Sequence, residues 1–405
     1  MDMVRKGIGV VLLIGACCGG QQCGAAELEV VPGLSVRQEY TDNLFFAYKK
    51  EIEDFITTLS PQLQVKRRSE RFEGSAGTRL DISFHRDNDE QDATDQEYSG
   101  TGRYALTERA GVSGSADLRV DSRPDRDLET AGLVQGSDTS RTWHYGLATD
   151  YRLSEISSAR LGYDFGRTEY DDPDKVDYRT DAVALLYNRD LGALLPRTVG
   201  RSALQYIGYD MGASRIRNYS WTVGAEHRLN ERWQVFGDLG ARLTHAEFDR
   251  RRLVPTVVPG LFRLEPYTVA DDGGGFIGEL GLAFAGERAA STFSVRHGLE
   301  AASGRSGAVE RTSLRGNYGY RLGERTRLQV GGEFFLNRSS DEEFATAAID
   351  EQTLQARASF RYGFTKDLAA EVFYTYTRVE DRADDTERTR NLFCFRFLYN
   401  YGITL

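Results

Sequence analysis

The residues of this chain that are best suited to chemistry are its arginines. Lysine occurs only six times, so 45 of the 51 basic residues are arginine. A guanidinium group is planar and can donate paired hydrogen bonds to a carboxylate or a sulfate. Arginines and acidic residues recur at alternate positions along the sequence, and we take nine of them as candidates for a polar path through the protein: Arg103, Arg152, Asp238, Arg242, Arg315, Glu333, Arg357, Arg361 and Glu371.

Two interpretations of these nine residues are open. In the first, the arginines and acids pair with one another across neighbouring strands and fill a hydrated interior without any ligand. In the second, the arginines form a track that selects an acidic substrate. Arg321, Asp150 and Glu279 share the same alternation and fit either interpretation.

The sequence offers little for catalysis or for metal binding. The five histidines are scattered, and no Gly-x-Ser-x-Gly motif is present. Only one cysteine, Cys394, lies after Ala26, so the chain beyond that point can form neither a thiolate metal site nor a redox pair. We therefore predict no enzymatic activity, no metal and no cofactor. The alternative, a barrel enzyme, would need a buried histidine beside a serine or aspartate at a strand end.

The start of the chain, residues 1–26, resembles an export signal. A basic start is followed by an apolar run of about ten residues, which is too short to cross a bilayer as a helix. Small residues up to Ala26 predict cleavage after that position, and lipidation of Cys17 is the alternative. We therefore divide the chain into a signal peptide, residues 1–26, and a barrel domain, residues 27–405.

The elements that must position the candidate residues are long β-strands. From Phe393 to the C-terminus every second residue is aromatic or apolar, whereas the residues between them, starting at Cys394, are mostly small or polar. The same alternation recurs upstream, for example from Trp233 to Thr244. We expect strands roughly twice as long as those of globular sheets, which usually have about five or six residues. Long strands with one apolar and one polar face indicate a membrane barrel with a hydrated lumen.

Two kinds of connection alternate along the chain. Eight short turns, such as Glu70-Arg71 and Glu324-Arg325, alternate with nine longer and often acidic loops. These connections predict an all-β fold, a transmembrane antiparallel up-and-down β-barrel of about 18 strands with both termini in the periplasm. We expect residues 250–272, the longest and most apolar loop, to form a constriction or to pack on the rim. We also expect Pro61 to cause a β-bulge.

Two short segments resemble the opening of the putative β-barrel porin 2 family. In that family a strand ends in Tyr-Thr-Asp-Asn before an external loop, and Ser-Pro opens the return strand. Here the first segment runs from Glu39 to Phe45 and the second from Leu59 to Leu63. The residues that match the family motif are Tyr40, Thr41, Asp42, Asn43, Ser60 and Pro61.

The resemblance implies an outer-membrane channel that exports an exopolysaccharide, with periplasmic polysaccharide-export components as partners. A porin for the diffusion of small polar solutes is the alternative. Either channel would lie in the outer membrane of a Gram-negative cell, contact its lipids and require the barrel-assembly machinery. A nucleic-acid partner is not expected, because the formal net charge is −10 at pH 7.

Overall fold

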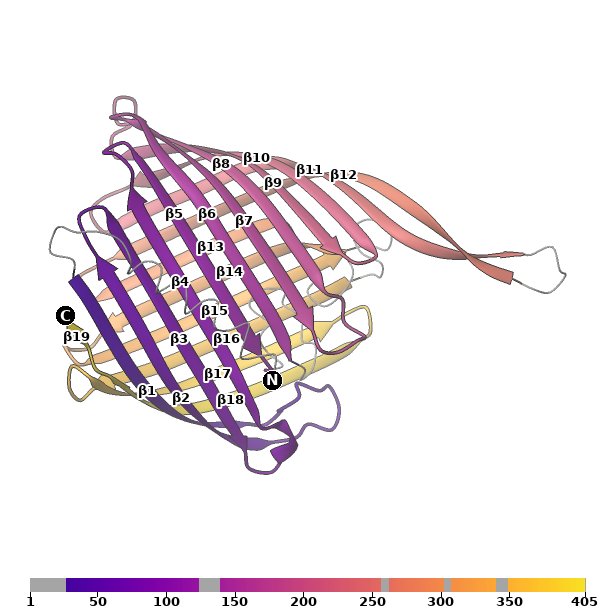
Figure 1. Cartoon of the computed structure of the whole chain (residues 1–405), viewed down its shortest axis with the longest axis horizontal. Coiled ribbons are helices and arrows are strands. Elements are labelled where there is room, and N and C mark those ends of the chain that lie inside the picture. The colour runs from indigo at the N-terminus through magenta and orange to yellow at the C-terminus, as the bar shows by residue number, and fades with distance from the viewer. Residues whose placement is uncertain (1–26, 124–138, 256–261, 302–306, 340–348, 405) are drawn as a thin grey trace.

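The alternating segments form a closed β-barrel of 18 antiparallel strands, in which each strand pairs with the next and the last with the first (Figure 1). The structure, a computed structural model, describes residues 27–404 except 124–138, 256–261, 302–306 and 340–348. No helix in these ranges is long and apolar enough to cross a membrane. The strands are β1 (Glu27–Thr41), β2 (Asp54–Arg68), β3 (Phe72–His85), β4 (Ala93–Ala105), β5 (Ala110–Asp121), β6 (Ser140–Ser154), β7 (Ser157–Tyr170), β8 (Tyr178–Asp190), β9 (Thr198–Met211), β10 (Ser214–Arg228), β11 (Trp233–Pro255), β12 (Phe262–Ala285), β13 (Ala289–Ala301), β14 (Ala308–Arg321), β15 (Thr326–Ser339), β16 (Ile349–Gly363), β17 (Leu368–Asp381) and β18 (Thr386–Asn400), followed by the two-residue β19 (Ile403–Thr404).

The predicted fold class and strand number are confirmed. The eight predicted short turns lie at one rim of the barrel, which we call the short-turn rim, and the opposite rim is the long-loop rim. One of the nine connections expected to be long is wrong: at the long-loop rim β9 and β10 are joined by residues 212–213 alone. Glu29 near the start of β1 lies opposite Thr404 in β19, so both ends of the barrel domain meet at the short-turn rim. That this rim faces the periplasm remains a prediction, and the proposed signal peptide lies outside the described residues.

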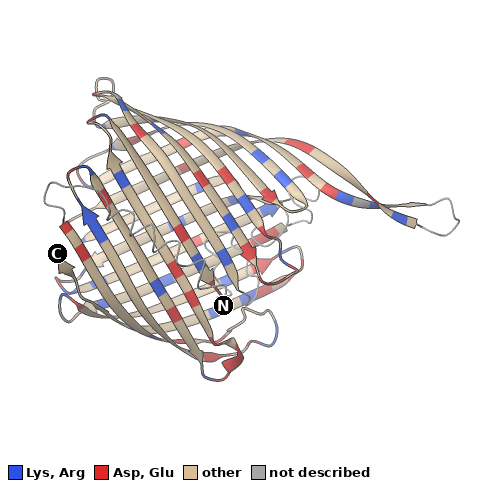
Figure 2. Cartoon of the chain, in the orientation of Figure 1, with Lys and Arg blue, Asp and Glu red and all other residues tan. Residues whose placement is uncertain are grey.

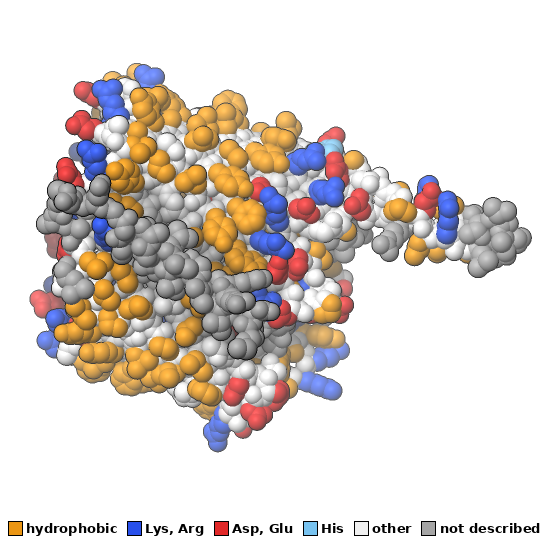
Figure 3. All heavy atoms as spheres, in the orientation of Figure 1, with side chains coloured by type: hydrophobic (Ala, Val, Ile, Leu, Met, Phe, Trp, Pro, Cys, Tyr) orange, Lys and Arg blue, Asp and Glu red, His pale blue; other side chains and the backbone are white. Residues whose placement is uncertain are grey.

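Each strand turns one face to the outside and the other to the lumen, because successive side chains alternate. On β18 the side chains of Phe393, Phe395 and Phe397 are 53%, 42% and 43% exposed, whereas Cys394 between them is 3% exposed. Apolar side chains cover the middle of the outer wall, and charged ones gather toward its ends (Figure 3). An outer wall of this kind suits hydrocarbon, because the backbone polar groups are paired within the closed sheet.

The connection between β11 and β12 differs from the expected long loop. Both strands extend far beyond their neighbours, and they remain paired up to Pro255 opposite Phe262. The pairing of β12 with β13 ends at Gly278 opposite His297. The two strands therefore project from the long-loop rim as a twisted hairpin (Figure 1). The prediction that residues 250–272 form a constricting or rim-packed loop is wrong, since most of them continue the two strands as a hairpin.

The prediction of a bulge at Pro61 is also wrong. Leu59 lies opposite Ile82 and Gln62 opposite Arg79, so the register between β2 and β3 is the same on both sides of the proline. Only the pairing at Ser60 and Pro61 is missing there. Proline has no N–H to donate, and the ladder omits that position without an inserted residue.

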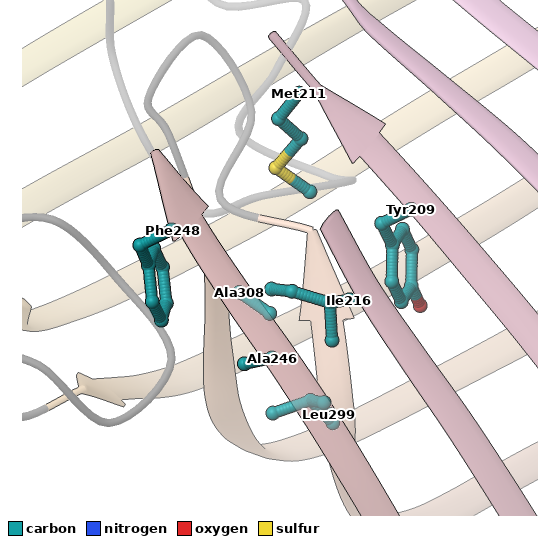
Figure 4. Packing of buried hydrophobic residues seen from close by; sticks show 7 residues of the cluster. All are labelled: Tyr209, Met211, Ile216, Ala246, Phe248, Leu299 and Ala308. Atoms are coloured by element: carbon teal, nitrogen blue, oxygen red, sulfur yellow. The ribbon is translucent and has the colours of Figure 1, made fainter. Parts of the chain in front are cut away.

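A group of buried apolar side chains closes part of the long-loop rim. This rim cluster consists of Tyr209, Met211, Ile216, Ala246, Phe248, Leu299 and Ala308 (Figure 4). By strand alternation, Ile216 and Phe248 belong to the inner face of β10 and β11, yet both have 0% exposure. The side chains that cover them include Leu299 and Ala308, from the ends of β13 and β14. The ends of β13 and β14 therefore narrow the opening of the lumen at the long-loop rim. This is the role that the sequence had led us to expect of residues 250–272.

Candidate functional site

Charged residues of both signs occur along strands all over the barrel rather than in one segment (Figure 2). A lumenal cavity of about 1160 Å³ lies along β14–β18 and β1–β5. The residues that line it include two of the predicted acids and arginines on nearby strands: Glu333, Glu371, Arg37, Arg327, Arg357, Arg361 and Arg396. A second cavity of about 840 Å³ lies along other strands and includes the predicted Arg103.

Five of the nine predicted residues form ion pairs. Asp238 accepts a hydrogen bond from Arg201 at 2.6 Å. The Arg315 and Glu333 side chains approach to 3.6 Å across β14 and β15. Glu371 pairs with Arg396 on the next strand, and Arg242 pairs with Glu310. For these residues the first interpretation, mutual pairing in the lumen, describes the geometry.

The other four predicted residues form no ion pair with any residue that the structure describes. Arg357 lies over the ring of Phe373, with 4.4 Å from its guanidinium carbon to the ring centre. Arg361 lines the same cavity, four positions further along β16. Arg103 lies in the second cavity, and Arg152 is at the short-turn end of β6. The second interpretation, an arginine track, therefore stays open for Arg357 and Arg361.

Seven further arginines of the first cavity were not among the predicted residues: Arg37, Arg79, Arg119, Arg123, Arg327, Arg390 and Arg396. Arg327 and Arg396 do alternate with apolar residues in the sequence, so their inward orientation could have been predicted. Their proximity to Arg361 could not, because it depends on which residues of neighbouring strands lie opposite each other.

The family motif closes the seam between β1 and β18. The Asn43 side chain is fully buried and donates hydrogen bonds to the carbonyl oxygens of Ala47 at 2.8 Å and Thr389 at 2.9 Å. Its Oδ1 accepts from the Ala47 N–H at 2.8 Å. Asp42 accepts from the backbone and side-chain N–H groups of Asn391. These contacts hold the first long connection against β18, so the motif serves the closure of the barrel at this rim.

The other motif residues contribute at neighbouring positions. The Tyr40 hydroxyl donates to Glu53 at 2.8 Å, which links the end of β1 to the start of β2. Thr41 is buried, and its hydroxyl accepts from the Asn43 N–H at 3.3 Å. Ser60 and Pro61 lie at the interruption between β2 and β3 described above. No group of three or more His, Cys, Asp or Glu side chains among the described residues is arranged to hold a metal ion.

One histidine is expected to titrate above the ordinary histidine pKa. After Leu243 the next outward positions of β11 are the polar His245, Glu247 and Asp249, so His245 lies beyond the apolar, membrane-facing part of the strand in the barrel wall. Its ring bonds Asp272 at 2.6 Å and Glu247 at 3.1 Å, and these carboxylates raise its pKa. Because its pKa is raised in the folded state, protonated His245 contributes its full stabilisation of the fold below the ordinary histidine pKa. This stabilisation is lost as the pH rises through the raised pKa.

The histidine prediction is checked by NMR titration of the protein with labelled histidine. The His245 midpoint should lie above the ordinary value, and Asp272→Asn should lower it. An unchanged midpoint in that variant would contradict the assigned cause.

Comparison with known families agrees with the sequence motif. Residues 27–183 match the model of the family described as Putative beta-barrel porin 2. The resemblance, noted in the two segments between Glu39 and Leu63, is thereby confirmed and extends into the eighth strand. No curated protein sequence matches the chain.

Solved outer-membrane proteins show a similar fold over almost the whole chain. Pseudomonas aeruginosa OpdO is 12% identical, with a TM-score of 0.46, and the match covers 93% of this chain and 97% of that one. Acinetobacter baumannii OccAB4 is 10% identical, with a TM-score of 0.47 and coverage of 94% and 99%. The Escherichia coli ferric-catecholate receptor Fiu is 8% identical, with a TM-score of 0.49 and coverage of 95% and 82%. At these identities the similarity concerns the fold alone.

Proposed function

We propose that this chain lets small polar solutes diffuse through its lumen. The premise is that it is a porin-like β-barrel of the outer membrane, whose residues 27–183 match the Putative beta-barrel porin 2 family. The observation that supports this proposal most is the charged cavity of about 1160 Å³ along β14–β18 and β1–β5. Barrels of about 16 to 18 strands generally leave an aqueous channel.

The two cavities favour small solutes over a polymer. Their volumes, about 1160 and 840 Å³, are of the size that small ligands occupy. The rim cluster takes up part of the mouth on one side, which leaves less room for a chain of linked sugars. Export of an exopolysaccharide, which the family resemblance implied, gains no support from the comparisons.

The orientation and the export route belong to the same proposal. Short turns on one rim and longer loops on the other are typical of barrels whose short turns face the periplasm. We therefore infer that both ends of the barrel domain face the periplasm, and that residues 1–26 act as the export signal.

Liposome swelling tests the proposed function. Vesicles containing the folded protein should swell rapidly in a monosaccharide or an amino acid and progressively more slowly in di-, tri- and tetrasaccharides. Vesicles with heat-unfolded protein provide the control. Absence of swelling in any small solute would contradict the diffusion proposal, and release of a trapped polysaccharide at a rate similar to that of a monosaccharide would favour polymer export.

A further inference from the structure

The strand register brings arginines from five neighbouring strands into a single row on the lumenal wall. Arg321 lies directly opposite Arg327, and Arg327 directly opposite Arg361. Arg361 lies opposite Glu371, Glu371 opposite Arg396, and Arg396 opposite Arg37. We call this set the arginine row; in order from β14 to β1 it reads Arg321, Arg327, Arg361, Glu371, Arg396 and Arg37.

All six side chains belong to the inner face. On each strand the next residue, such as Leu328 after Arg327 and Phe397 after Arg396, belongs to the outward apolar face. Five of the six line the larger cavity. Neighbouring strands are about 4.8 Å apart, so adjacent guanidinium groups of the row can contact one small ligand.

The two halves of the row differ in their partners. Arg396 pairs with Glu371, and Arg37 pairs with Glu39 at 3.1 Å. Arg321 bonds the carbonyl oxygen of Glu287, in the adjacent turn. Arg327 and Arg361 are exposed to the lumen and form no ion pair with any described residue.

Without a bound ligand, this arrangement of like charges destabilises the fold. Like charges directly opposite each other on neighbouring strands are destabilising, and the row contains two such pairs in succession. The arginines of the other half are neutralised by acids, so the lumen does contain structural ion pairs where they are needed. A ligand with a negative charge would supply the missing partner for the first half.

The neighbouring Arg357 adds to this half of the row. It lies four positions before Arg361 on the same face of β16, and its guanidinium group packs on the ring of Phe373. Packing on an aromatic ring restricts the side chain while its N–H groups can still donate. Three arginines, at 327, 357 and 361, therefore line the same cavity from two neighbouring strands.

We propose that Arg327 and Arg361, followed by Arg357 further along the same face of β16, form a binding site for the carboxylate of a small organic anion that passes through the lumen. This inference rests on the proposed diffusion function and names the class of solute. A guanidinium fork matches a carboxylate with two parallel hydrogen bonds. Successive arginines let the anion move from one to the next, which conduction requires, because a single tight site would hold the solute.

Ion selectivity in planar lipid bilayers tests the site. The reversal potential in a KCl gradient gives the chloride-to-potassium permeability ratio, and added succinate serves as the carboxylate probe that blocks the chloride current. The double variant R327Q/R361Q should lower the permeability ratio about threefold. It should also weaken the succinate block about tenfold, because it removes charge-assisted hydrogen bonds.

Two control variants separate charge in the lumen from damage to the fold. Arg338→Gln removes an arginine of the same strand as Arg327 that alternates onto the outer face, and it should leave both readouts unchanged. R327K/R361K keeps the charge and should keep the chloride preference. Heat-dependent mobility on gels checks that every variant is folded.

The outcomes distinguish this inference from the function on which it rests. A wild-type protein that conducts, with the same selectivity and succinate block in R327Q/R361Q, overturns the carboxylate site alone. Equal loss of preference in R338Q or in R327K/R361K also overturns it. A folded wild-type protein that shows no conductance overturns the diffusion function and the site together.

Discussion

Replacement of Phe248 by alanine is expected to lower the free energy of unfolding by about 3–5 kcal/mol. The Phe248 side chain lies on the inner face of β11 and has 0% exposure. It packs in the rim cluster, which also contains Leu299 and Ala308 from the ends of β13 and β14. Alanine would leave a cavity there, because residues on three different strands cannot all close on the missing ring. Guanidinium unfolding of the protein in detergent micelles measures the change.

The same substitution should also affect the channel. Without Phe248 the ends of β13 and β14 lose much of their contact with β11, so single-channel conductance should become larger and noisier. Phe262→Ala is the matched control, since its side chain is 61% exposed on the projecting hairpin. That variant should change stability by less than about 0.5 kcal/mol. Equal stabilities of the two variants would show that the rim cluster is not packed as described.

Asn43→Ala is the second substitution with a large expected effect. Its buried side chain forms three hydrogen bonds with backbone groups of Ala47 and Thr389, and alanine would leave those groups without these partners. Each buried polar group that loses its partner costs about 1–3 kcal/mol. Because Thr389 belongs to β18, the loss falls on the seam that closes the barrel, and we expect a lower unfolding temperature on heat-dependent gel mobility.

A matched asparagine separates this effect from a general change in composition. Asn188 on β8 is partly buried and forms no side-chain hydrogen bond with any described residue. Asn188→Ala should therefore unfold at the wild-type temperature. If Asn43→Ala behaved in the same way, the assignment of the family motif to barrel closure would be wrong.

The sequence by itself determined the class of fold, the number of strands and the two faces of each strand. Phe393, Phe395 and Phe397 alternate with Cys394 and Arg396, and the structure exposes the former and turns the latter inward. This was predictable because the period of two is a local property of an extended chain, and the eight predicted short turns are marked by their own residues. The family motif at Asn43 could likewise be recognised from the sequence, although its role in closing the seam between β1 and β18 could not be predicted.

Only the tertiary structure decided which residues of different strands meet. The strand of Arg327 was evident from the sequence, but its position opposite both Arg321 and Arg361 depends on the register between three strands. Residues 250–272 looked like a loop, and only the pairing of β11 with β12 made them a hairpin. The rim cluster likewise joins Phe248 and Leu299, which lie on strands that are not neighbours in the sheet. Alternation fixes the face on which a side chain lies, whereas register and the packing of distant strands depend on the whole closed sheet, which no local pattern contains.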